Sequence, residues 1–223
     1  MAKSKHPYSV HPSTRLMADW VENLPAKTGK SLDQWMKHIV KDGPTDEKAR
    51  REWLAKTYKL GTNAALWLAE KATRPETIAE ETPEGYLKIA PKYVEDQYAG
   101  KKGVLRPVYD ALLVMGLAAG KDAKACPCKT FVPLFREHVF AQIKPTTNTR
   151  IDLGLALGAL PESKITGHKG RVVSTGGREK KDRITHRIAV AGVDEIDGLM
   201  EKWARAAYEL DAPGDPALRA GRK

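Results

Sequence analysis

In the segment Thr130–Lys144, TFVPLFREHVFAQIK, the spacing of apolar residues in this 223-residue chain changes from a helical to a strand pattern. Before Gly120 the apolar residues recur at helical spacing. In this segment aromatic and β-branched side chains suit a pleated, half-buried surface. Glu137 separates the halves 130–136 and 138–144 and indicates a tight connection. We therefore expect two antiparallel strands here, within a sheet domain.

The residues on either side of this hairpin extend the same domain. Segments 150–155 and 183–190 alternate apolar and polar residues and predict two more strands. Residues 161–182, rich in Gly, Ser and Lys, predict a loop. An apolar helix ends at Gly120, and an amphipathic helix starts at Asp194. The expected domain is a small antiparallel sheet flanked by helices.

The first third of the chain shows helical periodicity, which begins near Ser13 and is first interrupted at Pro25. Ser31 with Gln34 three residues later has the spacing of a capping box, and Gly43-Pro44 should end that helix. Three tryptophans fall one per helix on the apolar faces: Trp35, Trp53 and Trp67. This pattern predicts an all-α helical bundle.

The predicted fold class is therefore α+β, with five successive segments. They are a flexible arm (1–13), the helical bundle (14–74), a linker that includes one helix (75–103), the α+β domain (104–211) and a flexible tail (212–223).

Composition excludes several classes of protein. Apolar residues make up 41% of the chain, which is too many for a disordered protein. No stretch approaches the roughly 18 apolar residues of a membrane span, and no apolar segment follows the basic N-terminus as in a secretory signal. Two cysteines do not form a disulfide framework. We expect a cytoplasmic protein without a membrane association.

Positive charge is concentrated in the sheet region. The whole chain carries +10, and residues 121–190, with fourteen Lys/Arg and six Asp/Glu, account for +8 of it. Such a surface attracts polyanions, DNA or RNA above all. Phe140 is a candidate for base stacking. The candidate phosphate contacts are Lys144, Arg150, Lys169, Arg171, Arg178, Lys180, Lys181, Arg183 and Arg187.

No motif identifies a catalytic residue, a cofactor or a metal site. Asp152, Glu162 and Lys164 have the D-x9-E-x-K spacing of metal-dependent nucleases, but Glu162 heads a loop rather than a strand. Cys126-Pro127-Cys128 lacks the second ligand pair that zinc needs. His186 lies in a predicted strand with no nucleophile placed beside it.

Two stretches resemble known bacterial domains of unknown function. Residues 28–32, TGKSL, with Trp35 and the Leu60-Gly61 turn resemble the start of DUF4287. Residues 109–208 resemble DUF5655, through FAQIKP at 140–145, TRIDLGL at 149–155 and WARAAY at 203–208. The resemblance implies a helical domain followed by a small α+β domain, and implies no reaction or cofactor.

Three functions remain open from the sequence. The first is a non-enzymatic protein that binds nucleic acid or another polyanion through its basic C-terminal domain. The second is an enzyme, either a metal-dependent nuclease or an unrecognised activity. The third is a protein-interaction module that docks a protein partner on the helical domain.

Overall fold

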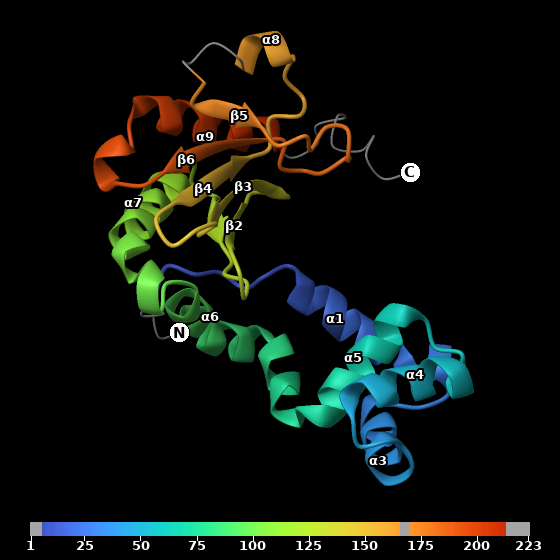
Figure 1. Ribbon diagram of the computed structural model, residues 1–223. Helices are drawn as coiled ribbons and strands as arrows, with labels where there is room; N and C mark the ends of the chain where they lie inside the picture. Colours follow the sequence, from blue (N-terminus) through green and yellow to red (C-terminus); the bar gives the residue numbers. More distant parts are fainter. Residues whose placement is uncertain (1–5, 166–169, 213–223) are drawn as a thin grey trace. The chain divides into compact units, whose positions relative to one another are not determined.

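The computed structural model describes residues 6–165 and 170–212. It confirms the α+β class and divides into two compact units (Figure 1). The helical unit spans Val10–Ile89. The sheet unit contains Ala90 onward together with the N-terminal residues up to Ser9. Lys169, in the basic loop, and the predicted tail from 213 lie outside the described residues.

The helical unit consists of short helices around a small core. Its largest fully buried side chains include Trp35, Ile39, Leu54 and Leu68. The elements are α1 (Ser13–Glu22), α2 (Leu24–Thr28), α3 (Leu32–Asp42), α4 (Glu47–Tyr58), α5 (Thr62–Thr73), the 3-10 helix η1 (Pro75–Glu81) and the start of α6 (Pro83–Gln97). No helix among the described residues is long and apolar enough to cross a membrane.

Local sequence signals set most of these helix ends. The capping box of Ser31 and Gln34 is present at the start of α3. Pro25 does not end a helix as predicted. The first helix stops at Glu22, and Pro25 lies in the first turn of α2, where its missing N–H would have no intrahelical partner. Gly61 directly precedes α5 as its N-cap, and Lys59 takes the left-handed conformation that ends α4.

The segment after α5 begins with the 3-10 helix η1, which packs back onto α5. Lys71 of α5 is 4% exposed, and its Nζ donates to the carbonyl and the hydroxyl oxygen of Thr77, both at 3.1 Å. The same ammonium forms an ion pair with Glu81 at 2.8 Å. A buried charge needs such partners, so these contacts hold η1 against α5.

The sheet unit is built on six strands in the order β1-β2-β3-β4-β6-β5, all neighbouring pairs being antiparallel. The sequence predicted β2, β3, β4 and β6 and missed the short edge strands β1 and β5. The elements are η2 (Gly100–Leu105), α7 (Arg106–Leu117), β1 (Lys124–Ala125), β2 (Val132–Phe135), β3 (Val139–Lys144), β4 (Ile151–Leu155), α8 (Glu162–Ile165), β5 (Val172–Ser174), β6 (His186–Val190), η3 (Val193–Glu195) and α9 (Gly198–Leu210).

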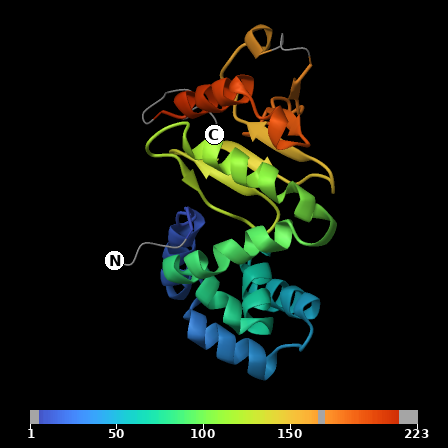
Figure 2. The same cartoon turned by 90° about the vertical axis from the view of Figure 1, so that its left-hand side faces the viewer.

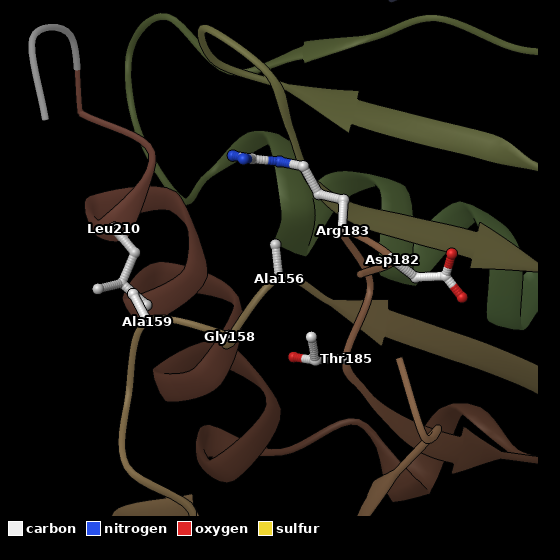
Figure 3. A pocket seen from close by; sticks show the side chains of 7 residues that line it. All are labelled: Ala156, Gly158, Ala159, Asp182, Arg183, Thr185 and Leu210. Carbon is white, nitrogen blue, oxygen red and sulfur yellow. The ribbon is translucent and has the colours of Figure 1, made fainter. Parts of the chain in front are cut away.

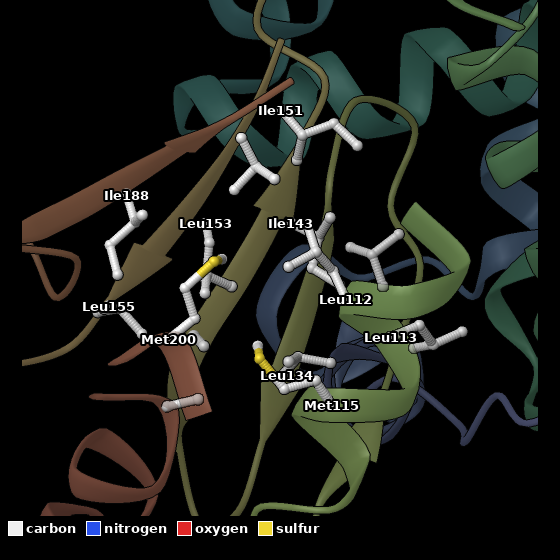
Figure 4. Packing of buried hydrophobic residues seen from close by; sticks show 14 of the residues in the cluster. Leu112, Leu113, Met115, Leu134, Ile143, Ile151, Leu153, Leu155, Ile188 and Met200 are labelled. Carbon is white, nitrogen blue, oxygen red and sulfur yellow. The ribbon is translucent and has the colours of Figure 1, made fainter. Parts of the chain in front are cut away.

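Helices α7 and α9 cover one face of this sheet (Figure 2). Ile143, Leu153 and Ile188 lie opposite one another on β3, β4 and β6 and are fully buried. Leu112 of α7 and Met200 of α9 pack onto this row (Figure 4). The closing helix starts later than predicted, because Asp197 rather than Asp194 caps it through the Met200 N–H.

The other face, called here the polar face, carries the alternate residues of the same strands. Gln142, Gly154 and Arg187 form one row across β3, β4 and β6, and Lys144 lies opposite Asp152 in the next row. Successive side chains of a strand point to opposite faces, so the buried row dictates which residues reach this surface.

The described part of the N-terminal arm is docked on the sheet unit. Tyr8 forms a parallel bridge with Ala125 of β1, and the Ser9 N–H donates to the Ala125 carbonyl at 2.9 Å. The Tyr8 hydroxyl also bonds that of Tyr109 at 3.1 Å. This segment therefore continues the β1 edge of the sheet.

Candidate polyanion interface

Two of the predicted phosphate contacts pair with one carboxylate on the polar face, and a third lies opposite that carboxylate in the strand register. We call Lys144, Arg150, Asp152 and Arg187 the Asp152 cluster. Asp152 forms two ion pairs on the same side-chain oxygen. Arg150 Nε lies 3.0 Å from that oxygen, and Arg187 Nη1 lies 3.2 Å from it. The Thr146 hydroxyl donates to the second oxygen of Asp152 at 2.8 Å. The strand register alone brings β3, β4 and β6 residues together here.

The charges of the Asp152 cluster do not cancel. Asp152 is 14% exposed and neutralises only one of three cations, which leaves +2. The Arg150 and Arg187 side chains are 38% and 33% exposed, and Lys144 is exposed. Because a guanidinium has five N–H donors in a fixed fork, each arginine keeps donors for a second acceptor. The cluster can therefore hold an anionic oxygen.

Three other arginines that we predicted as phosphate contacts instead form ion pairs and hydrogen bonds within the protein. Arg171 pairs with Asp197 and donates to the Glu195 carbonyl at 2.9 Å. Arg178 pairs with Glu162 at 3.2 Å and donates to the Gly158 carbonyl at 2.7 Å.

Arg183 donates to the Val139 carbonyl at 2.7 Å and pairs with Asp211. With Arg171 and Arg178 it forms a group of arginines whose contacts fix the segments next to β3, β5 and α9. Lys180 and Lys181, by contrast, are exposed on the turn between β5 and β6.

Phe140 cannot stack a nucleobase in this structure. Its side chain is 0% exposed, and its ring packs edge-on against Tyr208 of α9 at 5.5 Å between centroids. The stacking prediction fails because the aromatic ring belongs to the core.

The D-x9-E-x-K residues do not assemble into one site. Glu162 lies on α8 and hydrogen-bonds His186, which shares the buried face with Leu155. Asp152 lies on the polar face beside Arg187. Within the described ranges no group of three or more His, Cys, Asp or Glu is arranged to hold a metal ion.

His186 is the centre of a buried polar relay that the sequence did not reveal. The Leu157 N–H donates to the Thr185 hydroxyl at 3.2 Å, and that hydroxyl bonds His186 Nδ1 at 2.9 Å. His186 Nε2 bonds Glu162 at 3.0 Å. The hydrogen bond from His186 is the main cause that lowers the pKa of Glu162.

A cavity of about 250 Å³ lies beside this relay (Figure 3). Thr185, Ala156, Gly158, Ala159, Asp182, Arg183 and Leu210 line it. Thr185 is only 3% exposed, and its hydroxyl is already bonded on both sides. The relay therefore ties the 157–165 segment to β6 rather than presenting a nucleophile to solvent.

Cys126 is a buried thiol and Cys128 a partly buried one, and both should have low reactivity. Burial raises the pKa of Cys126 to about 12 and that of Cys128 to about 11. At pH 8 we expect iodoacetamide to alkylate Cys128 in the folded chain about a hundredfold more slowly than in urea, where a thiol titrates near pH 8.5. Mass spectrometry of the alkylated peptides measures both rates. Equal rates in the two conditions would contradict the raised pKa of Cys128.

The fold defines a two-unit α+β protein in which Arg150 and Arg187 pair with one carboxylate on the polar face of an antiparallel sheet. The chain belongs to the DUF5655 family, a domain of unknown function that matches residues 94–211. Residues 17–74 match a second domain of unknown function, DUF4287. Both matches confirm the resemblances drawn from the sequence. Comparison with curated proteins and with solved structures finds no match.

Proposed function

We propose that the sheet unit binds nucleic acid through the phosphate backbone, with the Asp152 cluster as its centre. The observation that supports this proposal is a local excess of +2: Asp152 pairs with the partly exposed Arg150 and Arg187, and the exposed Lys144 lies opposite Asp152 on the neighbouring strand. Such pre-positioned guanidinium groups suit phosphate oxygens better than mobile side chains do.

We infer that the turn with Lys180 and Lys181 adds to the same surface. Ile184, which follows these lysines, lies over the polar face, since a Cβ on Gly154 would come within 2.7 Å of its Cγ2. The turn therefore leaves the sheet on the side of the Asp152 cluster. Contacts of this kind touch phosphates rather than base edges, so the binding should tolerate any sequence.

Fluorescence anisotropy with labelled duplex DNA, single-stranded DNA and RNA tests the proposal at about 50 mM salt, where phosphate contacts are strong. Affinity should fall steeply with added salt. Lys144→Gln should reduce the slope of log K against log [salt] by about 1, the contribution of one phosphate contact. Lys202→Gln, with the same charge change on α9 across the sheet, should leave that slope unchanged.

A substitution of opposite sign sharpens the test. Asp152→Asn keeps an acceptor for the two arginines and raises the cluster charge from +2 to +3, so it should strengthen binding. The proposal fails if none of the three nucleic acids binds at about 50 mM salt. It also fails if Lys144→Gln and Lys202→Gln weaken binding equally.

A protein partner on the helical unit stays a prediction. Leu16 of α1 and Val40 of α3 are exposed at 67% and 64%. Their exposure is the feature that such a partner would cover.

A further inference from the structure

The helical unit contains a hydrogen-bonded chain of carboxylate, imidazole and phenol that neither family match assigns. Asp42 and His38 lie one turn apart on α3, and Asp42 Oδ2 is 2.8 Å from His38 Nδ1. The other ring nitrogen, His38 Nε2, bonds the hydroxyl of Tyr58, the last residue of α4. Two helices thus combine to build this relay.

The chemistry of the partners decides where the protons lie. An ionised carboxylate only accepts hydrogen bonds, so Nδ1 of neutral His38 carries the hydrogen that it donates to Asp42. The lone pair of Nε2 then faces Tyr58, whose O–H must be the donor. This is the arrangement in which an oriented imidazole removes a proton from a hydroxyl nucleophile.

Neighbouring aromatic rings hold this phenol in place. Trp35 and Trp53 each meet the Tyr58 ring edge-on, both at 5.1 Å between centroids. His38 also lies 5.4 Å from Trp53 between ring centroids. These contacts limit the rotation of both members of the hydrogen bond.

The relay is accessible and has a cation beside it. His38 is 22% exposed, and Tyr58 is partly exposed. Lys30 Nζ lies 5.7 Å from the centroid of the Tyr58 ring. A cation at that distance can attract an electrophile that carries an anionic oxygen.

We propose that Tyr58 is a nucleophilic modification site for activated phosphoryl esters, with His38 as its base, Asp42 as the residue that orients His38, and Lys30 as the electrostatic guide. The Tyr58 oxygen forms a bond to phosphorus while the bond from phosphorus to the leaving oxygen breaks. That oxygen departs with the bonding electron pair. The phenol proton moves to His38 Nε2 and from there to solvent.

Benzenesulfonyl fluoride is the probe, because it has the same tetrahedral electrophilic centre. The Tyr58 oxygen bonds to sulfur, the S–F bond breaks with loss of fluoride, and His38 takes the proton. Peptide mass spectrometry on the full chain measures the labelling rates of Tyr58 and of Tyr93, a partly exposed helical tyrosine that serves as an internal control. Tyr58 should react faster than Tyr93.

Two variants separate a base from a merely structural contact. His38→Gln should slow the labelling of Tyr58 by about tenfold or more. This lower bound lies under the usual rate contribution of a general base. The labelling rate of Tyr93 should not change. Asp42→Asn, at a side chain 48% exposed, should keep the fold by circular dichroism and still slow Tyr58. The proposal is overturned if Tyr58 reacts no faster than Tyr93, or if Asp42→Asn labels at the unchanged rate.

Discussion

Asp211→Ala is expected to lower the free energy of unfolding of the sheet unit by about 3 kcal/mol, the usual cost of breaking a buried charged network. The Asp211 side chain is 1% exposed. It accepts from the His138 backbone N–H at 2.7 Å and from His138 Nδ1 at 3.1 Å, and it pairs with Arg183. Without it, these donors lose their acceptor at the junction of β3, α9 and the approach to β6.

Hydrogen exchange followed by mass spectrometry measures this effect on peptides that cover 132–144 and 183–212. Glu209→Ala, at an exposed carboxylate of α9 two residues before Asp211, is the matched control and should stay within about 0.5 kcal/mol of the parent. If Asp211→Ala also stays within that range, the contacts of Asp211 do not stabilise the unit.

Lys71→Ala is expected to destabilise the helical unit by about 2–3 kcal/mol, through lost packing and an unsatisfied Thr77 carbonyl. Three acceptors surround the ammonium, and Glu81, the charged one, is 33% exposed. After the substitution water can reach Glu81, but it reaches the buried Thr77 poorly. Because Glu81 regains a partner, we expect a smaller loss of stability than for Asp211→Ala.

Urea denaturation followed by tryptophan fluorescence reports on this unit, because Trp20, Trp35, Trp53 and Trp67 lie in it and Trp203 does not. Performing the comparison in a Trp203→Phe background removes the fifth signal. Lys56→Ala, at a side chain 81% exposed, should change stability little. A shift for Lys71→Ala no larger than that control would refute a structural role for the buried ammonium.

Local signals predicted the helical unit well because a helix end depends on a few neighbouring residues. Ser31 and Gln34 form their capping box within one turn, and Asp46 caps α4 through the Ala49 N–H three residues on. The misplaced break at Pro25 arose because proline suits the first turn of a helix as well as a position beyond the end of one.

Strand prediction succeeded where alternation extended over five or six residues. β3 and β4 show that pattern, since one of their faces lies under α7 and α9. β1 has two residues and β5 has three, too few to establish a period. Their conformation comes from pairing with β2 and β6, which lies outside their own sequence.

The basic character of the sheet region follows from composition, whereas the availability of each cation depends on distant partners. Arg187 on β6 hydrogen-bonds Asp152 on the neighbouring strand β4. Arg183 hydrogen-bonds Asp211, which lies 28 positions later in the sequence. The residues around Phe140 in the sequence suit a binding surface, but the fold buries the Phe140 side chain.

The amino-acid sequence alone established that a basic antiparallel sheet would form. The TFVPLFREHVFAQIK segment carries the strand pattern, and residues 121–190 carry a net charge of +8. Both are properties of the chain itself. Only the tertiary structure decided which cations remain on the polar face and that His38 meets Tyr58. Those outcomes depend on strand register and helix packing, which bring residues far apart in sequence within hydrogen-bond distance.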